Sequence, residues 1–405
     1  MKIRSITCFY NPISKNAVKV LQRLSAMQAE VRSAYASIGI TVQSTRLATT
    51  PLSNYFPADD PKLGFRLARQ LNTQIKQLGF DYLSLGPALI NDQNLLKHFP
   101  SILSKAEDSF LSAIIADRET GISLPAIRQA AKTIHKISQI GNDGFANLRF
   151  AALANVLPFN PFFPAAYSQG HAPAFAFAMQ CADDVLHAFQ QSTSLENARA
   201  NLLNALHGGA EKMESVAKIL ARKYDLTFKG FDFSPAPYPH DWCSLGAALE
   251  ALGVSRLGLS GSLAAAAFLA DTLQQGQWLK TGFNGVMLPV LEDSRLASRS
   301  TEGVLGVYDL LLYSAVCGTG LDTIPLPGDI SAEEIEPLLL DLAALAIRLD
   351  KPLTARLMPI PGKRAGDKTD FHFDYFANGR VLDYRTGSLK GLMAGNEIFH
   401  LSSRK

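Results

Sequence analysis

Short apolar runs alternate with segments of helical periodicity along most of the chain, and this alternation limits the folds open to it. Strand candidates rich in branched or aromatic residues lie at Ile3–Tyr10, Thr41–Leu47, Tyr82–Leu85, Ser112–Asp117, Ala174–Cys181, Phe228–Phe233, Val286–Leu291, Thr323–Leu326 and Leu353–Ile360. Helical spacing between them is clearest over Ser331–Leu349, where Ser331 and Glu334 form a capping box. Roughly ten strands alternating with helices are typical of an α/β protein with a mostly parallel sheet.

The alternation continues to about residue 360 without a Ser/Gly/Pro-rich linker. We therefore expect one α/β domain over residues 1–360, whose sheet can be open or closed into a barrel. Within it, Leu195–Tyr224 is predicted as two helical segments hinged at Gly208 and Gly209. Residues 361–405 are charged, Gly-rich and strand-like, and we interpret them as an appendage.

Charge and hydropathy exclude several classes of partner. The 39 basic and 36 acidic residues leave a net charge of +3, which gives no reason to expect a nucleic acid or membrane partner. The first residues, Met1–Cys8, lack the long apolar stretch of a signal peptide, and the four cysteines form no Cys-x-x-Cys pair. We expect a cytoplasmic protein that acts on a small molecule, and base rates favour a homodimer.

A cysteine followed by two glycines is the first catalytic candidate. Cys317 precedes Gly318 and Gly320, and Asp322 lies five residues further on. Glycines allow a sharp turn and the close approach of a ligand, so the thiol and the carboxylate could converge on one substrate. The alternative is a buried cysteine beside a glycine that ends a helix.

Two adjacent carboxylates, Glu292 and Asp293, follow the apolar strand candidate Val286–Leu291. The C-terminal end of a strand is where α/β enzymes place catalytic groups or metal ligands. Neighbouring residues of a strand point to opposite faces, so the two would act as a pair only if the chain has already turned. The alternative for Asp293 is the N-cap of the next helix.

Polar residues of two turns are candidate ligand contacts. Asp143, Asn147 and Arg149 lie just before an apolar segment, which places them at a strand end, and His171 follows in a Ser-Gln-Gly-His sequence. The alternative for each is stabilisation of its own turn.

Ser260, Gly261 and Ser262 open an Ala-rich helix. Free backbone N–H groups and the helix dipole make this a candidate anion cradle, although the sequence matches neither a Walker A loop nor a dinucleotide fingerprint. The alternative is a simple N-cap by one of the serines.

Asp370, His372 and Asp374 alternate with aromatic residues. In a strand all three would share one face, a spacing compatible with a divalent metal. The alternative is a solvated polar face.

Three motifs carry a family resemblance: Phe283–Asp293, Val316–Asp329 with its Cys-Gly-x-Gly-Leu-Asp run, and Ala355–Lys363. Together they resemble an uncharacterised prokaryotic family known as domain of unknown function 711, or uncharacterised protein family 0210. Met1–Thr7 and Phe231–Pro237 are also similar to that family, as is the helix start at 261–267. The resemblance covers nearly the whole chain.

The resemblance implies a ten-stranded α/β barrel similar to that of pyruvate formate-lyase and anaerobic ribonucleotide reductase. Those enzymes store a radical on a glycine near the C-terminus. Here Asp383 stands where that glycine would be, within Arg380–Tyr384, so no glycyl radical is expected. Members of the family are often encoded beside a small ACT-domain regulator, which implies an amino-acid-linked role and such a regulator as a partner.

Two hypotheses for function follow. In the first, the chain is an enzyme acting on a small polar metabolite, with Cys317 as nucleophile or acid/base and Asp322 as its partner. Glu292 or Asp293 would be a second carboxylate or a metal ligand, and Arg356 would clamp an anion. In the second, the chain is a ligand-binding or regulatory protein without an activated nucleophile. The residue pattern identifies no cofactor other than a divalent metal as a candidate.

Overall fold

The strands of the protein form one mixed sheet in the computed structural model, which describes residues 1–56, 60–170 and 172–404. The strands are β1 (Lys2–Tyr10), β2 (Val42–Thr49), β3 (Tyr82–Ala88), β4 (Ser109–Asp117), β5 (Gly121–Ser123), β6 (Phe150–Ala154), β7 (Ala174–Gln180), β8 (Thr227–Ala236), β9 (Gly320–Pro327), β10 (Leu353–Ile360) and β11 (Ile398–Phe399). Neighbours along the sheet follow the order β8-β7-β1-β2-β3-β4-β6-β10-β9, and the short strands β5 and β11 lie off this path. The predicted α/β class is confirmed.

The strands run in two directions. β1, β2, β3, β4 and β6 are parallel to one another. β7 pairs antiparallel with β1, and β10 pairs antiparallel with β6, while β8 and β9 run parallel to β7 and β10 respectively. The burial of both faces explains why β6 and β7 read as nearly continuous apolar runs, although strands such as β1 and β2 also carry polar and charged residues.

The ladder of hydrogen bonds does not close between the end strands β8 and β9. Residues 279–291 cross this gap with isolated bridges, which join Lys280 to Phe231 of β8 and Pro289 to Asp322 of β9, both parallel. The predicted strand Val286–Leu291 is therefore wrong as a continuous strand. Pro289 is one physical reason, because proline has no N–H to donate to a ladder. A hydrogen-bonded ten-stranded barrel, as the resemblance implied, is not what the sheet forms.

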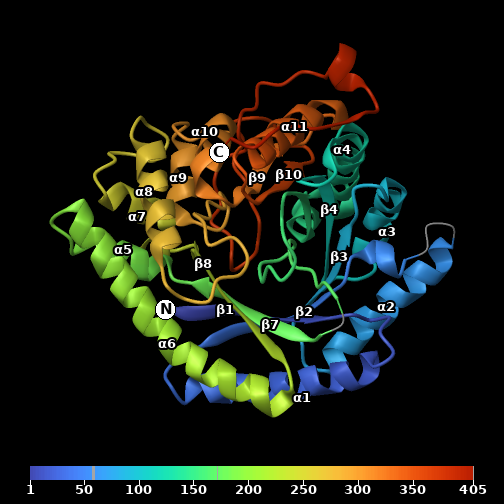
Figure 1. The fold of residues 1–405 in the computed structure, drawn as a ribbon. Helices are drawn as coiled ribbons and strands as arrows, with labels where there is room; N and C mark the ends of the chain where they lie inside the picture. The colour runs from blue at the N-terminus through green and yellow to red at the C-terminus, as the bar shows by residue number, and fades with distance from the viewer. Residues whose placement is uncertain (57–59, 171, 405) are drawn as a thin grey trace.

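Helices surround the curved sheet on its outside (Figure 1). They are α1 (Ala17–Ala36), α2 (Pro61–Gln77), α3 (Phe99–Leu103), α4 (Leu124–Ser138), α5 (Ala182–Gln190), α6 (Leu195–Tyr224), α7 (Leu245–Ala251), α8 (Ser262–Gln275), α9 (Ser294–Thr301), α10 (Val307–Cys317) and α11 (Ala332–Arg348). α11 begins with the predicted capping box: the backbone N–H of Glu334 donates to Ser331 Oγ, and the Glu334 carboxylate accepts from the Ser331 N–H. The apolar faces of α4 and α11 pack against each other and against the sheet.

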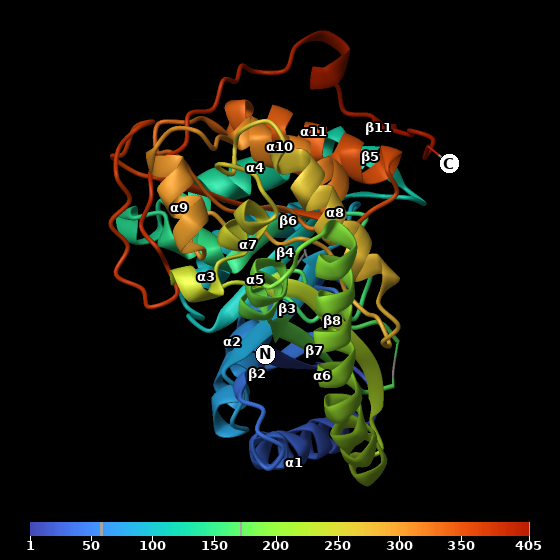
Figure 2. The same cartoon turned by 90° about the vertical axis from the view of Figure 1, so that its left-hand side faces the viewer.

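The predicted hinge at Gly208 and Gly209 is wrong, because α6 is one continuous helix of 30 residues that passes beside α1 (Figure 2). Gly209 has a packing reason instead. A Cβ atom at this position would lie 2.6 Å from the sulfur of Met1, so the missing side chain makes room for the N-terminus.

The tail after residue 360 packs along the body of the protein and is largely irregular, so the strand-like interpretation is wrong for most of it. Only β11 forms a strand there among the described residues, and it pairs with β5. Val381 and Leu382 are buried, and Phe376 joins a cluster with Leu148 and Met358. Within the described ranges, no helix is long and apolar enough to cross a membrane.

Candidate functional site

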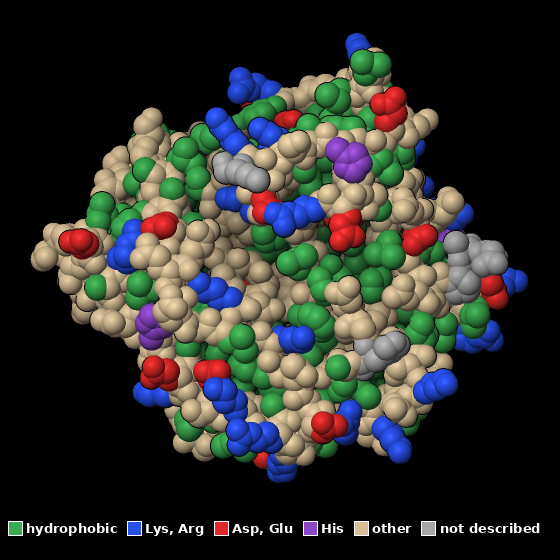
Figure 3. Space-filling model, in the orientation of Figure 1, with side chains coloured by type: hydrophobic (Ala, Val, Ile, Leu, Met, Phe, Trp, Pro, Cys, Tyr) green, Lys and Arg blue, Asp and Glu red, His purple; other side chains and the backbone are tan. Residues whose placement is uncertain are grey.

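A cavity of about 250 Å³ lies where β1, β2, β9 and β10 face one another, and we call it the central cavity. Its charged and polar lining comprises Arg4, Gln43, Ser44, Arg46, Asp81, Glu292, Asp322, Thr354 and Arg356. Its aromatic lining comprises Tyr82, Phe110, Phe162, Phe163, Phe283, Phe373 and Tyr375. The face of the molecule in Figure 3 is hollowed near its centre, where hydrophobic and basic side chains gather.

β-bulges occur at the strand positions that supply the charges. The β1–β7 register skips Arg4, and the β9–β10 register places Arg356 opposite Asp322 and Thr323. Thr323 has a φ of +44°, which is rare for a β-branched residue. Bulges turn a side chain out of its regular alternation, and here they direct these charges into the central cavity.

The Glu292 carboxylate binds two arginines that come from distant strands. Arg4 Nη2 donates to its Oε2 at 2.5 Å, and Arg356 Nη2 donates to its Oε1 at 2.8 Å. Arg356 Nε also donates to Oδ1 of Asp322. Burial alone would lower the pKa of Arg356, but the two adjacent carboxylates outweigh it and raise that pKa. The three residues predicted separately at 292, 322 and 356 thus form one buried ion network.

Arg46 is the one cavity arginine among the described residues without a carboxylate partner. Its Nε donates to Ser44 Oγ at 3.0 Å, and its guanidinium lies 5.6 Å from the ring centroid of Tyr82 and 5.1 Å from that of Phe163. Burial and the nearby charge of Arg4 lower the pKa of Arg46 to about 10. It therefore remains a cation at neutral pH at an electrostatic cost that a bound anion would relieve.

Asp293 points away from Glu292, as expected for adjacent residues, and caps two helices. Its Oδ1 accepts from the N–H groups of Arg295 and Leu296 at the start of α9 and from Ser244 Oγ. Its Oδ2 accepts from the N–H of Leu245 at the start of α7. The N-cap alternative for Asp293 is therefore confirmed, and a metal has no place on these occupied oxygens. Burial raises the pKa of Asp293 despite these bonds.

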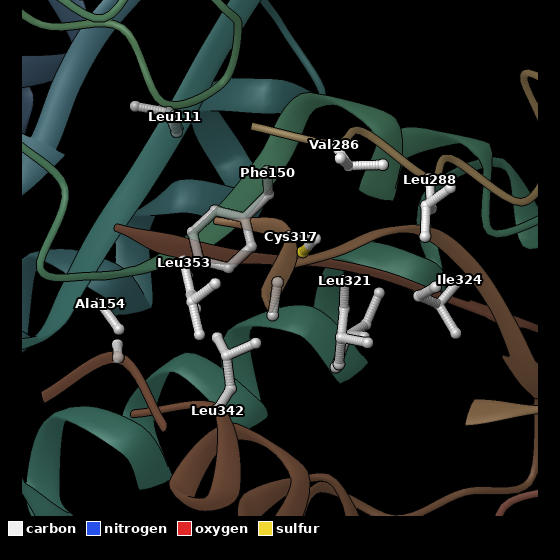
Figure 4. Close-up of a cluster of buried hydrophobic side chains, with 14 of the residues drawn as sticks. Leu111, Phe150, Ala154, Val286, Leu288, Cys317, Leu321, Ile324, Leu342 and Leu353 are labelled. Carbon is white, nitrogen blue, oxygen red and sulfur yellow. The ribbon is translucent and has the colours of Figure 1, made fainter. Parts of the chain in front are cut away.

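Cys317 lies in the hydrophobic core and does not line the central cavity. Its side chain is 1% exposed, and Figure 4 shows it among Val286, Leu321 and Phe150. The sulfur lies 3.5 Å from Thr319 Oγ1, and the Thr319 N–H donates to it at the same distance. This packing corresponds to the alternative of a buried cysteine beside a helix end, since Gly318 is the C-cap of α10.

The other glycines and the serine cluster have local backbone roles. A Cβ atom at Gly320 would lie 2.2 Å from the Thr354 carbonyl oxygen, so this glycine permits close strand pairing. Ser262 Oγ accepts from the Gly258 N–H and donates to the Leu259 carbonyl. Ser260 and Gly261 are exposed, and none of Ser260, Gly261 and Ser262 lines the central cavity.

The polar residues predicted near position 145 bind backbone groups outside the central cavity. Asp143 accepts the N–H of Phe145, Asn147 donates to the carbonyl of Ile134, and Arg149 donates to the carbonyl of Ala106. Asp143 thus follows the turn-stabilising alternative, whereas Asn147 and Arg149 hold their turn to segments that are distant in the sequence. His171 lies outside the described residues.

The alternating segment 370–374 is not a strand. Asp370, His372 and Asp374 are exposed, and Asp370 pairs with Lys363 at 3.0 Å. No group of three or more His, Cys, Asp or Glu side chains in the described parts of the chain could hold a metal ion. The aromatic residues of this segment are the informative ones, because Phe373 and Tyr375 line the central cavity.

Sequence reasoning missed Arg4, Arg46 and the aromatic wall. A signal existed for the arginines: each is a charge inside a segment predicted as a strand, where a charge is costly unless it is paired or functional. The aromatic residues give no such signal, because most phenylalanines of an apolar sequence belong to the core.

The fold and the cavity define a mixed α/β protein with a largely paired cluster of charges at the centre of its sheet. The family model described as "Uncharacterised ACR (DUF711)" matches residues 1–378, and the chain belongs to this family, as the sequence motifs had indicated. A UPF0210 protein of Pyrobaculum arsenaticum is 31% identical over 353 residues, which cover 83% of this chain and 77% of the relative. A UPF0210 protein of Oenococcus oeni is 27% identical over 380 residues, which cover 87% and 82%.

Proposed function

We propose that this chain binds a small organic anion in the central cavity and that Arg46 contacts the anionic group. The observation that carries this proposal is the half-buried Arg46 guanidinium on the cavity wall, whose two terminal nitrogens have no protein partner in the described ranges. A partly buried cation without a counter-charge loses hydration that no protein group replaces, so an arginine held in this way favours the binding of an anion.

The charge balance of the central cavity supports the same conclusion. Arg4 and Arg356 are neutralised by Glu292 and Asp322, and Asp81 at the cavity wall pairs with Arg32. Arg46 therefore leaves one positive charge in excess. The volume of about 250 Å³ falls just below the range of about 300–1,000 Å³ typical of pockets for drug-sized ligands, and suits a metabolite.

Ligand binding is the function that these contacts favour, and catalysis on the ligand is the second candidate. One observation favours it: Oδ2 of Asp322 has no protein partner among the described residues, while Oδ1 is held by Arg356. A fixed carboxylate oxygen facing a ligand can accept a proton as a general base. In this second candidate function, Asp322 takes the catalytic role, and Glu292 and Arg356 hold it in place. Cys317 contributes only to the packing of the core.

We also infer that the family barrel is completed by residues 279–291. The support is that nine strands lie along the sheet, and this segment bridges the two end strands in parallel orientation. The buried Asp232 carboxylate of β8 accepts the N–H groups of Phe283 and Asn284 and fixes the segment at that edge. The central cavity would then lie inside the barrel. The proposal includes no radical step, because Asp383 replaces the glycine that would store the radical.

The proposal is tested with a thermal-shift screen of carboxylates, amino acids and phosphate esters, followed by calorimetry on the compounds that stabilise the protein. A ligand at a hundred times its Kd stabilises by about 2.7 kcal/mol, which is easily detected. We expect Arg46→Met to abolish the shift and Arg222→Met, at an exposed position of α6, to retain it. Anion binding that survives in Arg46→Met, or the absence of any Arg46-dependent ligand, would contradict the proposal.

A further inference from the structure

We infer that the ligand of the central cavity is an aromatic monocarboxylate. This inference rests on the proposed function and specifies its ligand class. It follows from three features: the way Arg46 is held, the pairing of the other two arginines, and the aromatic residues among the rest of the lining.

Arg46 has one of its three nitrogens occupied within the protein and two available at the cavity wall. Tyr82 and Phe163 lie within 5.6 Å and 5.1 Å of its guanidinium carbon, and Ser44 Oγ accepts the hydrogen of Nε. The two terminal nitrogens therefore remain as a planar pair of donors, the geometry that matches the two oxygens of a carboxylate.

A single negative charge is all that the cavity can neutralise. Both oxygens of Glu292 already accept from Arg4 and Arg356, and Arg356 also binds Asp322. A second anionic group on the ligand would meet no unpaired cation among the described residues and would lie near these carboxylates. The contacts thus favour a monoanion over a dicarboxylate or a phosphate dianion.

Much of the rest of the wall is aromatic, beside the aliphatic side chains of Leu148, Ala151, Pro164, Ala165 and Met287. Phe110 and Phe163 are in edge contact with a centroid distance of 5.3 Å, Phe162 lies in the same loop as Phe163, and Phe283 comes from the segment between β8 and β9. The tail closes the wall with Phe373, whose ring packs edge-to-face on Phe145 at 5.1 Å. Such a wall offers several ring edges and faces to one further ring in offset or T-shaped geometry. The volume equals that of about eight waters, which suits a single-ring acid.

The test measures binding of three probes to the full chain by calorimetry. Phenylacetate has the ring and the carboxylate, acetate has only the carboxylate, and benzyl alcohol has the ring without the charge. We expect phenylacetate to bind at least about tenfold more tightly than either of the others. Arg46→Met should remove its binding, while circular dichroism and the unfolding midpoint confirm that the variant is folded.

Two variants of the tail test whether the aromatic wall contacts the ring of the ligand. Phe373 and Phe371 both pack on Phe145 and Phe376, but only Phe373 lines the central cavity. Phe373→Leu should weaken phenylacetate binding about fivefold, and Phe371→Leu should change it less than about twofold.

The outcomes separate this inference from the proposed function. Acetate that binds as tightly as phenylacetate, or equal affinities in the two tail variants, overturns the aromatic class but leaves anion binding by Arg46 intact. If phenylacetate does not bind but the wider screen finds another ligand that depends on Arg46, the aromatic class is likewise overturned and anion binding by Arg46 stands. Absence of any Arg46-dependent ligand overturns both.

Discussion

Arg356 and Glu292 form a buried ion pair at 2.8 Å that joins strand β10 to the end of the segment crossing from β8 to β9. The second oxygen of the same carboxylate binds Arg4 of β1, so one glutamate connects two strands, β1 and β10, that run in opposite directions in the sheet. Both side chains of the 2.8 Å pair are about nine-tenths buried. Loss of one partner from a buried pair leaves an uncompensated charge, which costs far more than the pair itself contributes.

The first prediction follows from this pair. Glu292→Gln leaves Arg4 and Arg356 without their common anion, and we expect the free energy of unfolding to fall by about 3 kcal/mol in urea denaturation. Glu302→Gln is the control, because Glu302 is one-third exposed and its partner Arg299, although nine-tenths buried, keeps its pairing with Glu250. The control should lose less than about 1 kcal/mol. Equal losses in the two variants would mean that the central network contributes no more than a surface pair.

The second prediction concerns the double cap by Asp293. Its carboxylate accepts five hydrogen bonds at the starts of α7 and α9. Asp293→Ala should therefore reduce the free energy of unfolding by about 3 kcal/mol or more, since buried N–H groups lose their acceptor. Ser331→Ala, which removes the single cap of α11, should cost about 1 kcal/mol. A loss from Asp293→Ala no larger than that from Ser331→Ala would argue against the double cap.

The sequence predicted many of the regular strands because burial on both faces makes them mainly apolar. β1, β7 and β10 appear nearly at their observed bounds, whereas β8 extends three residues beyond its predicted end. The strand prediction failed for Val286–Leu291, where the apolar residues are buried but the backbone does not form a continuous ladder of hydrogen bonds with a neighbouring strand. An apolar sequence predicts that a segment is buried. It does not predict whether the backbone of that segment forms hydrogen bonds to a neighbouring strand on each side.

The candidate site was only partly predictable for a related reason. Glu292, Asp322 and Arg356 stand near motif glycines and strand ends, where local sequence indicates function. The roles of Arg4 and Arg46 depend on pairing between strands far apart in the chain. Only the folded sheet shows that Arg4 has a carboxylate partner while Arg46 has none.

The third prediction addresses Cys317. All four cysteines are buried, and the Cys317 sulfur contacts core side chains and Thr319. We expect a thiol-selective alkylating reagent to label native protein slowly near pH 7 and unfolded protein fast. Cys317→Ala should lower the free energy of unfolding by about 1 kcal/mol and leave ligand affinity unchanged. Fast native labelling that disappears in Cys317→Ala would instead support the nucleophile hypothesis.

The fourth prediction is a pH dependence of ligand binding. The pKa of Arg46 is lowered to about 10, whereas that of Arg356 is raised, so Arg356 keeps its charge over the same range. The Arg46 guanidinium is charged below its pKa and neutral above it, and a carboxylate ligand stays ionised throughout. Affinity should therefore be constant from pH 7 to about 9 and fall about tenfold per pH unit above about 10.

In the protein without ligand, the titration of Arg46 should have the opposite effect: the free energy of unfolding should rise with pH where the affinity for the ligand falls. Because burial and the charge of Arg4 lower the pKa of Arg46 in the folded protein, the fold disfavours the charged form. The contribution of Arg46 to the free energy of unfolding should thus increase as the pH rises above about 10. The Arg46→Met variant should bind no ligand at any pH and should lack this dependence of stability, which separates Arg46 from other groups that titrate at alkaline pH. Affinity that stays constant through pH 11, measured while circular dichroism shows a folded protein, would mean that the anion is held by a different cation.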